Sequence, residues 1–334
     1  MQKPIISLIN CPGYVDLPAL FPKERRYISI IDSSIAEMYR SYFPHPQIVI
    51  DVSEECKSIK EVERLATLLL EMEADRETVI VAVGGGVITD LVGFVASTYM
   101  RGLPFIFVPT TLLAMVDASI GGKNGVNLGV YKNIIGVFRQ PECTVVCPQF
   151  LQTLPQKEYR QGLAEMVKSF IIADRERYFD FMNLPEKERQ EYKTIAPFIT
   201  AAASIKRAIV ESDPVEKGER KLLNLGHTFA HAIELVENIS HGEAVGIGIT
   251  LAAKLSVRLS LLDQLECNTI ISGLEKIGLR TGSPVKMDQV TDGFKKDKKR
   301  SGDVIHFVLI KKIGEAVVVP LQIDKLKELL YDLS

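Results

Sequence analysis

The sequence predicts an α/β domain with a parallel, Rossmann-like sheet over residues 1–148, followed by a mainly α-helical domain over residues 149–334. In the first part, short β-branched runs alternate with segments of helical periodicity, which is typical of βαβ units. After Pro148, most of the sequence shows apolar residues at helical spacing. The length of 334 residues agrees with this division, since a domain contains roughly 150 residues.

The elements of the first part follow one another in a regular order. Strands are expected at residues 27–31, 47–52, 78–83, 105–108 and 144–146, and helices at residues 58–72 and 90–97. In parallel sheets of this kind, ligands bind beyond the carboxyl ends of the strands. We therefore expect binding residues where the strand-like runs end.

The second part contains mainly helical patterns. Helices are expected at residues 157–174, 195–211, 223–237, 243–260, 264–277 and 324–333, and a pair of strands at 305–310 and 315–319. The polar run at residues 295–300 is interpreted as a solvated loop.

The composition argues against several kinds of partner. Lys and Arg number 40 against 42 Asp and Glu, whereas a nucleic-acid-binding protein usually has a basic excess. No apolar run is long enough to cross a bilayer, and the first residues lack a secretory signal, so no membrane partner is expected. Five scattered cysteines form no disulfide framework, which indicates reduced thiols and a cytoplasmic location.

A glycine-rich turn follows the expected strand at residues 78–83. Gly84 and Gly86 match the first two positions of a dinucleotide-binding fingerprint, but Thr89 occupies the third, where glycine or alanine is usual. The N-terminus of the next helix would offer N–H groups to a phosphate. Alone, this pattern fits a phosphate-binding turn and an ordinary strand–helix turn equally well.

A second polar element follows the strand at residues 105–108. Pro109-Thr110-Thr111 is followed by Asp117-Ala-Ser-Ile-Gly-Gly-Lys123 and then by Lys132-Asn133. Hydroxyls, paired glycines, a carboxylate and two lysines in so short a stretch indicate a site for an anionic small molecule.

Three of the five histidines lie close together in the helical part. His227 and His231 are four residues apart and share a helix face, which Glu234 extends. His241 lies in Ser240-His-Gly-Glu243, a capping box that would open the next helix. Imidazole suits zinc and similar ions. Spacing leaves the third ligand of a catalytic site open among His231, Glu234 and a distant acid.

Glu165 is the best candidate for the distant acid. It lies three residues before Lys168 on a helix whose neighbouring residues are apolar, so this charged pair is expected to be buried. Buried charges need partners, and a metal ion and an anionic substrate would supply them. Further polar residues that indicate an anion-binding wall precede His227: Lys206, Glu216, Arg220 and Asn224.

Together these motifs resemble the 3-dehydroquinate synthases, the sugar-phosphate cyclases of the shikimate pathway in aromatic amino acid biosynthesis. The matching segments follow the family's order along most of the chain: Gly84-Gly-Gly-Val-Ile-Thr-Asp90, Tyr99-Met-Arg-Gly102, Pro109-Thr-Thr-Leu-Leu113, Asp117-Ala-Ser-Ile-Gly-Gly-Lys123, Lys132-Asn-Ile-Ile-Gly136, Gly162-Leu-Ala-Glu-Met-Val-Lys168, Arg220-Lys-Leu-Leu-Asn-Leu-Gly-His-Thr-Phe-Ala-His231, His241-Gly-Glu243 and Asp297-Lys-Lys299. The sequence departs from the family at Thr89 and Ala230, where glycine is usual, at Ala118, where serine is usual, and at residues 127–131.

The resemblance implies a dehydroquinate synthase-like fold, with an NAD-binding domain, a helical metal-binding domain and an active site in the cleft between them. It implies that Glu165, His227 and His241 bind a divalent metal, Zn²⁺ or Co²⁺, and that His231 contacts substrate instead. The implied NAD contacts are Asp32, Glu54, Lys57, Gly85, Gly86, Val87, Asp90, Thr110, Thr111, Leu113, Asp117, Lys123, Lys132, Phe150, Thr153, Leu154 and Glu158. The implied sugar-phosphate contacts are Asp117, Lys123, Asn133, Lys168, Lys206, Arg220, Asn224, His231 and either Lys298 or Lys299. Arg101 would reach the site of a neighbouring subunit, which implies a homodimer.

The reaction implied by the resemblance converts 3-deoxy-D-arabino-heptulosonate 7-phosphate to 3-dehydroquinate and phosphate. It combines transient oxidation by NAD, loss of phosphate, reduction, ring opening and aldol closure. The alternatives are another sugar-phosphate cyclase of the deoxyinosose or valiolone type, an iron-type NAD-dependent alcohol or polyol dehydrogenase, and a non-catalytic binder. The cations Lys123, Lys168, Arg220 and Lys298 or Lys299 favour a cyclase over a dehydrogenase, because a simple alcohol does not require them.

Overall fold

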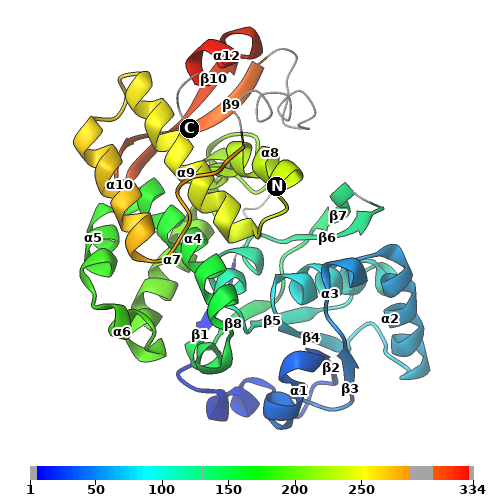
Figure 1. Ribbon diagram of the computed structural model, residues 1–334. Coiled ribbons are helices and arrows are strands. Elements are labelled where there is room, and N and C mark those ends of the chain that lie inside the picture. The colour runs from blue at the N-terminus through cyan, green and yellow to red at the C-terminus, as the bar shows by residue number, and fades with distance from the viewer. Residues whose placement is uncertain (1–5, 130, 286–303, 331–334) are drawn as a thin grey trace. The chain divides into compact units, whose positions relative to one another are not determined.

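The computed structural model describes residues 6–129, 131–285 and 304–330, and the chain forms two compact units (Figure 1). Unit 1 consists of Met1–Pro155 and Glu191–Ala203, and unit 2 of Gln156–Gln190 and Ser204–Ser334. The chain therefore passes between the compact units more than once. The expected single domain boundary after residue 148 stays a prediction.

Unit 1 is built on a parallel sheet with the strand order β1-β8-β5-β4-β2-β3. Its strands are β1 (Leu8–Asn10), β2 (Tyr27–Asp32), β3 (Gln47–Ile50), β4 (Val79–Gly84), β5 (Phe105–Pro109) and β8 (Cys143–Val146). The expected parallel sheet is confirmed, whereas β1 is too short to show an alternating pattern in the sequence. The strand order reverses between β2 and β4, so their carboxyl ends border a topological switch point, where such sheets bind ligands.

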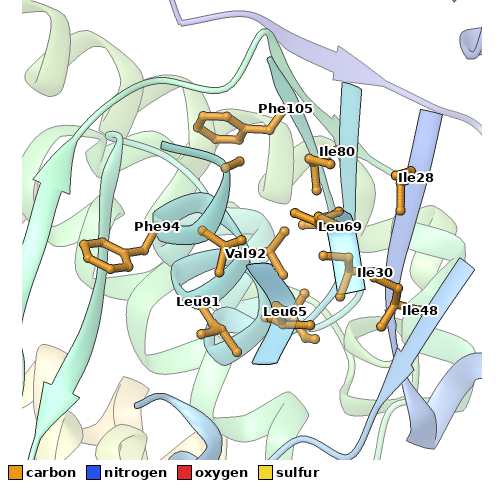
Figure 2. Close-up of a cluster of buried hydrophobic side chains, with 14 of the residues drawn as sticks. Ile28, Ile30, Ile48, Leu65, Leu69, Ile80, Leu91, Val92, Phe94 and Phe105 are labelled. Carbon is orange, nitrogen blue, oxygen red and sulfur yellow. The ribbon is translucent and has the colours of Figure 1, made fainter. Parts of the chain in front are cut away.

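The main core of unit 1 lies between this sheet and two helices, α2 (Ile59–Glu71) and α3 (Gly86–Thr98) (Figure 2). Alternate strand residues such as Ile28 and Ile80 face helix residues such as Leu65 and Val92, all with 0% exposure. Burying an aliphatic side chain contributes about 1.5–3 kcal/mol. This packing fixes α3 on the sheet and so holds the glycine turn before it in place.

Unit 1 also contains shorter helical segments. They are η1 (Tyr14–Leu20), α1 (Ser33–Tyr39), η2 (Arg40–Tyr42), η3 (Glu54–Cys56), η4 (Tyr99–Arg101), η5 (Ala114–Ala118) and η6 (Pro148–Thr153). Asp32 begins α1, because its carboxylate accepts a hydrogen bond from the backbone N of Ser34 at 2.9 Å.

An antiparallel hairpin of β6 (Lys123–Leu128) and β7 (Tyr131–Phe138) also belongs to unit 1. β6 packs against α3. The sequence predicts no strands here, because glycines and polar residues interrupt any alternation of apolar residues. Gly125 and Gly136 lie opposite each other, and a Cβ on either would come within 2.8 Å of backbone oxygen of the paired strand. The hairpin carries Lys123, Lys132 and Asn133 of the polar motif.

Unit 2 is mainly helical, as expected. Its helical segments, with α7 beginning in unit 1, are α4 (Gln156–Ala173), α5 (Arg175–Asn183), α6 (Glu186–Arg189), α7 (Tyr192–Ser212), η7 (Glu219–Asn224), α8 (His227–Glu237), α9 (His241–Arg258), α10 (Gln264–Lys276) and α12 (Ile323–Leu330). The expected pair of strands is confirmed as the antiparallel β9 (Val304–Lys312) and β10 (Glu315–Gln322). In the described part of the chain, no helix has the length and apolar character needed to cross a membrane.

The start of α8 lies unusually close to α9, the central helix of unit 2. Gly226 precedes α8 with a φ of +79°, a left-handed conformation that favours glycine. The helix expected from residue 223 therefore begins only at His227. A Cβ on Gly226 would lie 2.8 Å from the backbone N of Ile249, and a Cβ on Gly248 would overlap the carbonyl of Gly226. These glycines allow the approach that brings His227 toward His241.

Candidate metal centre and cofactor turn

Three side chains from different helices of unit 2 converge on one point. Glu165 lies within α4, while His227 and His241 are the first residues of α8 and α9. One donor atom of each lies within 4.8 Å of the other two donor atoms. Oε1 of Glu165 is 3.5 Å from Nε2 of His227 and 3.3 Å from Nε2 of His241. Glu165 is only 1% exposed, so its carboxylate is held inside the unit.

A capping box sets the position of His241. Ser240 is the N-cap residue of α9. The backbone N and the hydroxyl of Ser240 donate hydrogen bonds to the Glu243 carboxylate at 3.1 and 2.6 Å. This box was expected from the sequence and is confirmed. It begins the helix at His241 and thereby places the imidazole at the end of α9 that faces Glu165.

The charges around Glu165 balance one another. Burial raises the pKa of Glu165, but Lys168, His227 and His241 more than compensate and lower it well below its usual value. Burial lowers the pKa of His241, but its hydrogen bonds to Glu165 and Glu234 raise it to about 10. These interactions favour the ionised carboxylate and, without a metal, a cationic His241 whose Nε2 carries the second proton. A metal ion would displace that proton, since a ligating imidazole must be neutral.

The two imidazoles are oriented as metal ligands usually are. Nδ1 of His227 lies 3.2 Å from the carbonyl oxygen of Leu225, and Nδ1 of His241 lies 2.8 Å from Oε1 of Glu234. An acceptor at Nδ1 leaves Nε2 for a metal. Two imidazole nitrogens and one carboxylate oxygen suit Zn²⁺ or Co²⁺, and three protein ligands leave a position for substrate. The donor set therefore fits a catalytic divalent ion.

The structure distinguishes between the candidates that spacing leaves open. The cluster contains Glu165, and within the described residues neither His231 nor Glu234 belongs to it. The ring of His231 lies beside that of His227, with 5.7 Å between the ring centroids. Glu234 contacts the far side of the His241 ring instead. Helix spacing reports which residues share a face, but not which element faces them.

Several cations are buried in unit 2. Lys168, Lys206 and Arg220 are 2%, 8% and 2% exposed. Lys168 forms an ion pair with Glu165, and η7, which carries Arg220, lies against α4. Lysine and arginine side chains are the groups that bind carboxylates and phosphates in proteins. Unit 2 therefore holds side chains of the kind that an anionic ligand would need.

A carboxylate that the sequence analysis did not single out organises the loop before η7. Asp213 accepts hydrogen bonds from the backbone N of Lys217, Gly218 and Arg220, at 3.0, 2.6 and 3.1 Å. The Arg220 guanidinium in turn donates to the carbonyl of Pro214 at 2.7 Å. Asp213 therefore sets the loop conformation that holds Arg220. An Asp before a Pro is a common turn signal, but spacing alone does not reveal this contact.

The glycine turn in unit 1 lies at the switch point of the sheet. β4 ends at Gly84 and α3 begins at Gly86, so the turn is very short. A Cβ on Gly85 would lie 3.1 Å from Cγ2 of Thr111, and a Cβ on Gly86 would lie 3.1 Å from Cβ of Ala118. The first N–H groups of an α-helix have no partner within the helix and can bind a phosphate. The turn therefore fits the pyrophosphate of a dinucleotide.

Thr89, at the position where the fingerprint expects glycine, is accommodated within α3. Its side chain is fully buried, and its hydroxyl donates to the carbonyl of Gly86 at 3.0 Å. The hydroxyl is thus satisfied inside its own helix. The departure leaves the N-terminus of α3 intact.

Side-chain contacts link expected cofactor and substrate residues that lie on different elements of unit 1. The ammonium of Lys57 lies 2.5 Å from the Asp90 carboxylate. Nδ2 of Asn127 donates to Oε1 of Glu54 at 2.8 Å, and Oδ1 of Asn127 accepts from the backbone N of Asn133 at 2.9 Å. Asn127 therefore connects Glu54 and Asn133, which are both expected contact residues. The sequence analysis names Asn127 only within residues 127–131, where the chain departs from the family.

The remaining expected contacts have varied positions. Phe150 is 1% exposed and packs among Tyr14, Tyr39 and Phe43, so its side chain belongs to the core of unit 1. Others lie on or beside named elements: Asp32 at the end of β2, Val87 in α3, Thr110 after β5, Leu113 and Asp117 at η5, Thr153 and Leu154 at the end of η6, and Glu158 in α4 of unit 2. Arg101 is exposed on η4. Lys298 and Lys299 lie outside the described residues.

Two family models match consecutive parts of the chain. The model described as 3-dehydroquinate synthase N-terminal matches residues 47–161, and the model described as 3-dehydroquinate synthase C-terminal matches residues 162–300. Curated proteins named 3-dehydroquinate synthase from Coxiella burnetii and Campylobacter concisus are 39% and 41% identical to this chain. The matches cover 89% and 81% of this chain and 86% and 79% of those relatives.

Solved structures share the architecture over the whole chain. A 2-epi-5-epi-valiolone synthase from Streptomyces hygroscopicus with NAD⁺ and Zn²⁺ bound has a TM-score of 0.89 at 26% identity, covering 100% of this chain and 98% of that one. A 2-deoxy-scyllo-inosose synthase complexed with carbaglucose-6-phosphate, NAD⁺ and Co²⁺ has a TM-score of 0.86 at 27% identity, covering 98% and 97%. Butanol dehydrogenase A from Thermotoga maritima, at 12% identity, a TM-score of 0.65 and coverage of 99% and 98%, shares the fold alone.

Proposed function

The chain belongs to the 3-dehydroquinate synthase family, and from that premise we propose that it converts 3-deoxy-D-arabino-heptulosonate 7-phosphate to 3-dehydroquinate and phosphate. The observation that carries the proposal is the convergence of Glu165, His227 and His241 beside the buried Lys168. A metal-ligand set next to a buried cation suits a substrate that is both hydroxylated and anionic.

Glu165, His227 and His241 would hold the divalent ion, Zn²⁺ or Co²⁺. When bound, the ion supplies a Lewis acid that acidifies a substrate hydroxyl. Glu165 contributes the anionic ligand, and the two imidazoles contribute neutral nitrogens once His241 has lost its proton. The donor chemistry and the orientation of both rings support this role.

NAD would be held by the turn after β4. Gly85, Gly86 and Val87 offer the N-terminus of α3 to the pyrophosphate, and Thr111 packs against the turn. When bound, NAD supplies transient hydride acceptance and return. The remaining expected contacts are assigned to the ribose, adenine and nicotinamide parts of the cofactor: Asp32, Glu54, Lys57, Asp90, Thr110, Leu113, Asp117, Lys123, Lys132, Phe150, Thr153, Leu154 and Glu158.

The anionic groups of the substrate would meet the buried cations. The planar guanidinium of Arg220 suits the carboxylate, because it can donate to two oxygens at once, and Lys206 assists it. Contacts to the phosphate are assigned to Lys123, Asn224, His231, the Lys298–Lys299 region and Arg101 of a partner. Asp117, Asn133 and Lys168 orient the remaining polar groups. The protein then acts mainly by orienting groups, while the substrate phosphate itself accepts the proton in elimination.

Sequence similarity favours this substrate over those of the other cyclases. The curated relatives at 39% and 41% identity are named 3-dehydroquinate synthase, whereas the valiolone and inosose synthases are 26% and 27% identical. The cations Lys168, Lys206 and Arg220 also support this choice, because they suit an anionic substrate and a simple alcohol requires none of them.

We further infer a homodimer in which Arg101 serves the partner's site. Met100 and Arg101 have φ values of +48° and +70°. The left-handed region costs a residue other than glycine about 1–3 kcal/mol, and such strain often marks functional segments. This supports a special orientation for the exposed Arg101. The five free thiols support a cytoplasmic location.

A coupled assay on the purified, Zn²⁺-loaded protein tests the function. The heptulosonate phosphate is supplied with catalytic NAD, and released phosphate and dehydroquinate are followed together. Equal amounts of both products, abolished by a chelator, are the expected result. Turnover of another sugar phosphate in its place would favour another cyclase, and net NADH formed from an alcohol would favour a dehydrogenase.

A further inference from the structure

The carboxylate of Glu234 lies behind one imidazole of the candidate metal centre. Its Oε1 is 2.8 Å from Nδ1 of His241, while Nε2 of the same ring is 3.3 Å from Oε1 of Glu165. One ring nitrogen therefore faces the metal cluster and the other faces Glu234. The spacing of Glu234 from His227 suggested a candidate ligand, but the structure places it one contact away from the cluster.

We propose that Glu234 is a positioning residue that fixes the tautomer and the ring orientation of His241 and so determines how tightly the metal binds. The proposal rests on the proposed function, because it requires a metal ion on Glu165, His227 and His241. An N–H at Nδ1 that donates to the Glu234 carboxylate leaves the lone pair of Nε2 for the metal. A carboxylate partner also increases the basicity of the ligating nitrogen.

The two histidines differ in how they are oriented. His227 faces a backbone carbonyl, that of Leu225, and no side-chain substitution removes this acceptor. Its side chain is 13% exposed, whereas that of His241 is 37% exposed. His241 is therefore less enclosed by its surroundings and depends more on a specific partner. That partner is the Glu234 side chain, which is itself 19% exposed.

The local fold holds Glu234 in position. α8 ends at Glu237 and α9 begins at His241, and the two helices pack against each other. Because the connection is so short, the last turn of α8 lies near the first turn of α9. Asn238 ends α8 in the left-handed region, with a φ of +52°, and its backbone N donates to the carbonyl of Glu234 at 3.3 Å. The short connection from Asn238 to Ser240 then returns the chain to His241.

The experiment compares two variants of Glu234 with a matched control on the same helix. Glu234→Ala removes the acceptor, and Glu234→Gln keeps an oxygen but removes the charge. Glu237→Gln changes a nearby carboxylate that pairs with Arg280 and Ser283. Zn²⁺ affinity is measured by competition with a chromophoric chelator, and the Co²⁺-loaded proteins are compared by their visible absorption spectra.

We expect Glu234→Ala to weaken Zn²⁺ binding by about 10–100-fold, the usual effect of removing such a partner. Glu234→Gln should lose less affinity, because its amide oxygen can still accept from Nδ1, and its Co²⁺ spectrum should differ from that of the parent. Glu237→Gln should bind Zn²⁺ as the parent does. A merely structural role of Glu234 would not produce this order or change the Co²⁺ spectrum.

The proposal is overturned if the Zn²⁺ affinity of Glu234→Ala lies within about twofold of the parent value. It is also overturned if Glu237→Gln loses as much Zn²⁺ affinity as Glu234→Ala. If circular dichroism shows that Glu234→Ala is unfolded, the test depends on Glu234→Gln. In that case a parental Zn²⁺ affinity and a parental Co²⁺ spectrum of Glu234→Gln overturn the proposal. A parent that forms dehydroquinate while both Glu234 variants bind metal normally leaves the proposed function standing and removes this inference alone. If the parent protein binds no Zn²⁺, both the proposed function and this inference are overturned.

Discussion

Glu165 and Lys168 form an ion pair one helical turn apart in α4, and their side chains are only 1% and 2% exposed. The same carboxylate faces the two imidazoles of His227 and His241. Glu165 is therefore shared between a metal-ligand cluster and a buried cation. This arrangement links the electrostatics of the candidate metal centre to those of Lys168, one of the residues proposed to contact the substrate.

Loss of the metal should abolish activity without unfolding the protein. A chelator should stop turnover, and Zn²⁺ or Co²⁺ should restore it, because both ions accept nitrogen and oxygen ligands. Glu165→Gln and His227→Ala should be inactive with any added metal while their circular dichroism resembles that of the parent. Near-parental activity of either purified variant would contradict the metal assignment.

Lys168→Met should destabilise the metal-free protein by up to about 3 kcal/mol, since it removes one of the positive groups that compensate the buried Glu165 carboxylate and leaves only the imidazoles of His227 and His241 beside it. Urea unfolding with the metal chelated measures this effect. The double variant Glu165→Gln/Lys168→Met should be more stable than Lys168→Met alone, because no buried carboxylate remains. Equal stability of the two variants would show that Lys168 does not compensate the charge of Glu165.

Gly85→Val should lower NAD affinity at least about tenfold, or ~1.4 kcal/mol. Gly85 has an extended backbone that any residue adopts, so the effect comes from side-chain bulk near Thr111 at the mouth of the turn. Gly282→Val is the control, because nothing lies within 4 Å of a Cβ there. Calorimetric titration with NAD compares the two variants, and equal affinities would argue against a cofactor at this turn.

Asp213→Asn should lower stability at neutral pH but not in acid. Burial acts to raise the pKa of Asp213, but the hydrogen bonds from the backbone N–H groups of Gly218, Lys217 and Arg220 lower it below its usual value of 3.8. A lowered folded-state pKa stabilises the protein above pH 3.8, and this contribution is lost as pH falls through the folded-state value. Thermal unfolding at a series of pH values should show the difference between parent and variant shrinking below pH 3.8.

The same substitution should weaken substrate binding, because Asp213 holds the loop that carries Arg220. KM for the heptulosonate phosphate should rise more than kcat falls. Asp180→Asn, which removes only an exposed ion-pair partner of Arg177, is the matched control. A parental KM and a parental pH profile of stability for Asp213→Asn would exclude this positioning role.

Arg101 can be tested by mixing two inactive variants. Arg101→Ala and Glu165→Gln should each be inactive alone. If Arg101 serves the partner's site, a mixed dimer contains one site with both residues intact, so random reassociation should restore up to about a quarter of parental activity. No recovery after verified subunit exchange would place Arg101 in its own subunit's site or outside any site.

Much of the fold follows from local patterns in the sequence. The parallel strands β2, β3, β4, β5 and β8 and the helices α2, α3, α4, α9 and α10 follow from clear apolar patterns, and the capping box at Ser240 marks the start of α9. Elements whose patterns are weak are missed: β1 is too short, β6 and β7 are interrupted by glycines and polar residues, and α5 and α6 are rich in charges. Local propensity cannot reveal an element that tertiary contacts stabilise.

By itself, the sequence determined the element types, the glycine turn, the polar motifs and the family resemblance, because these depend on residue order along one chain. Residue spacing left the third member of the histidine cluster open, and only the family resemblance implied Glu165. The physical reason for Glu165 lies in the tertiary structure, since α4 must pack against α9 before Glu165 can reach His241. Helical spacing determines which residues share a face, whereas packing between helices determines what that face meets.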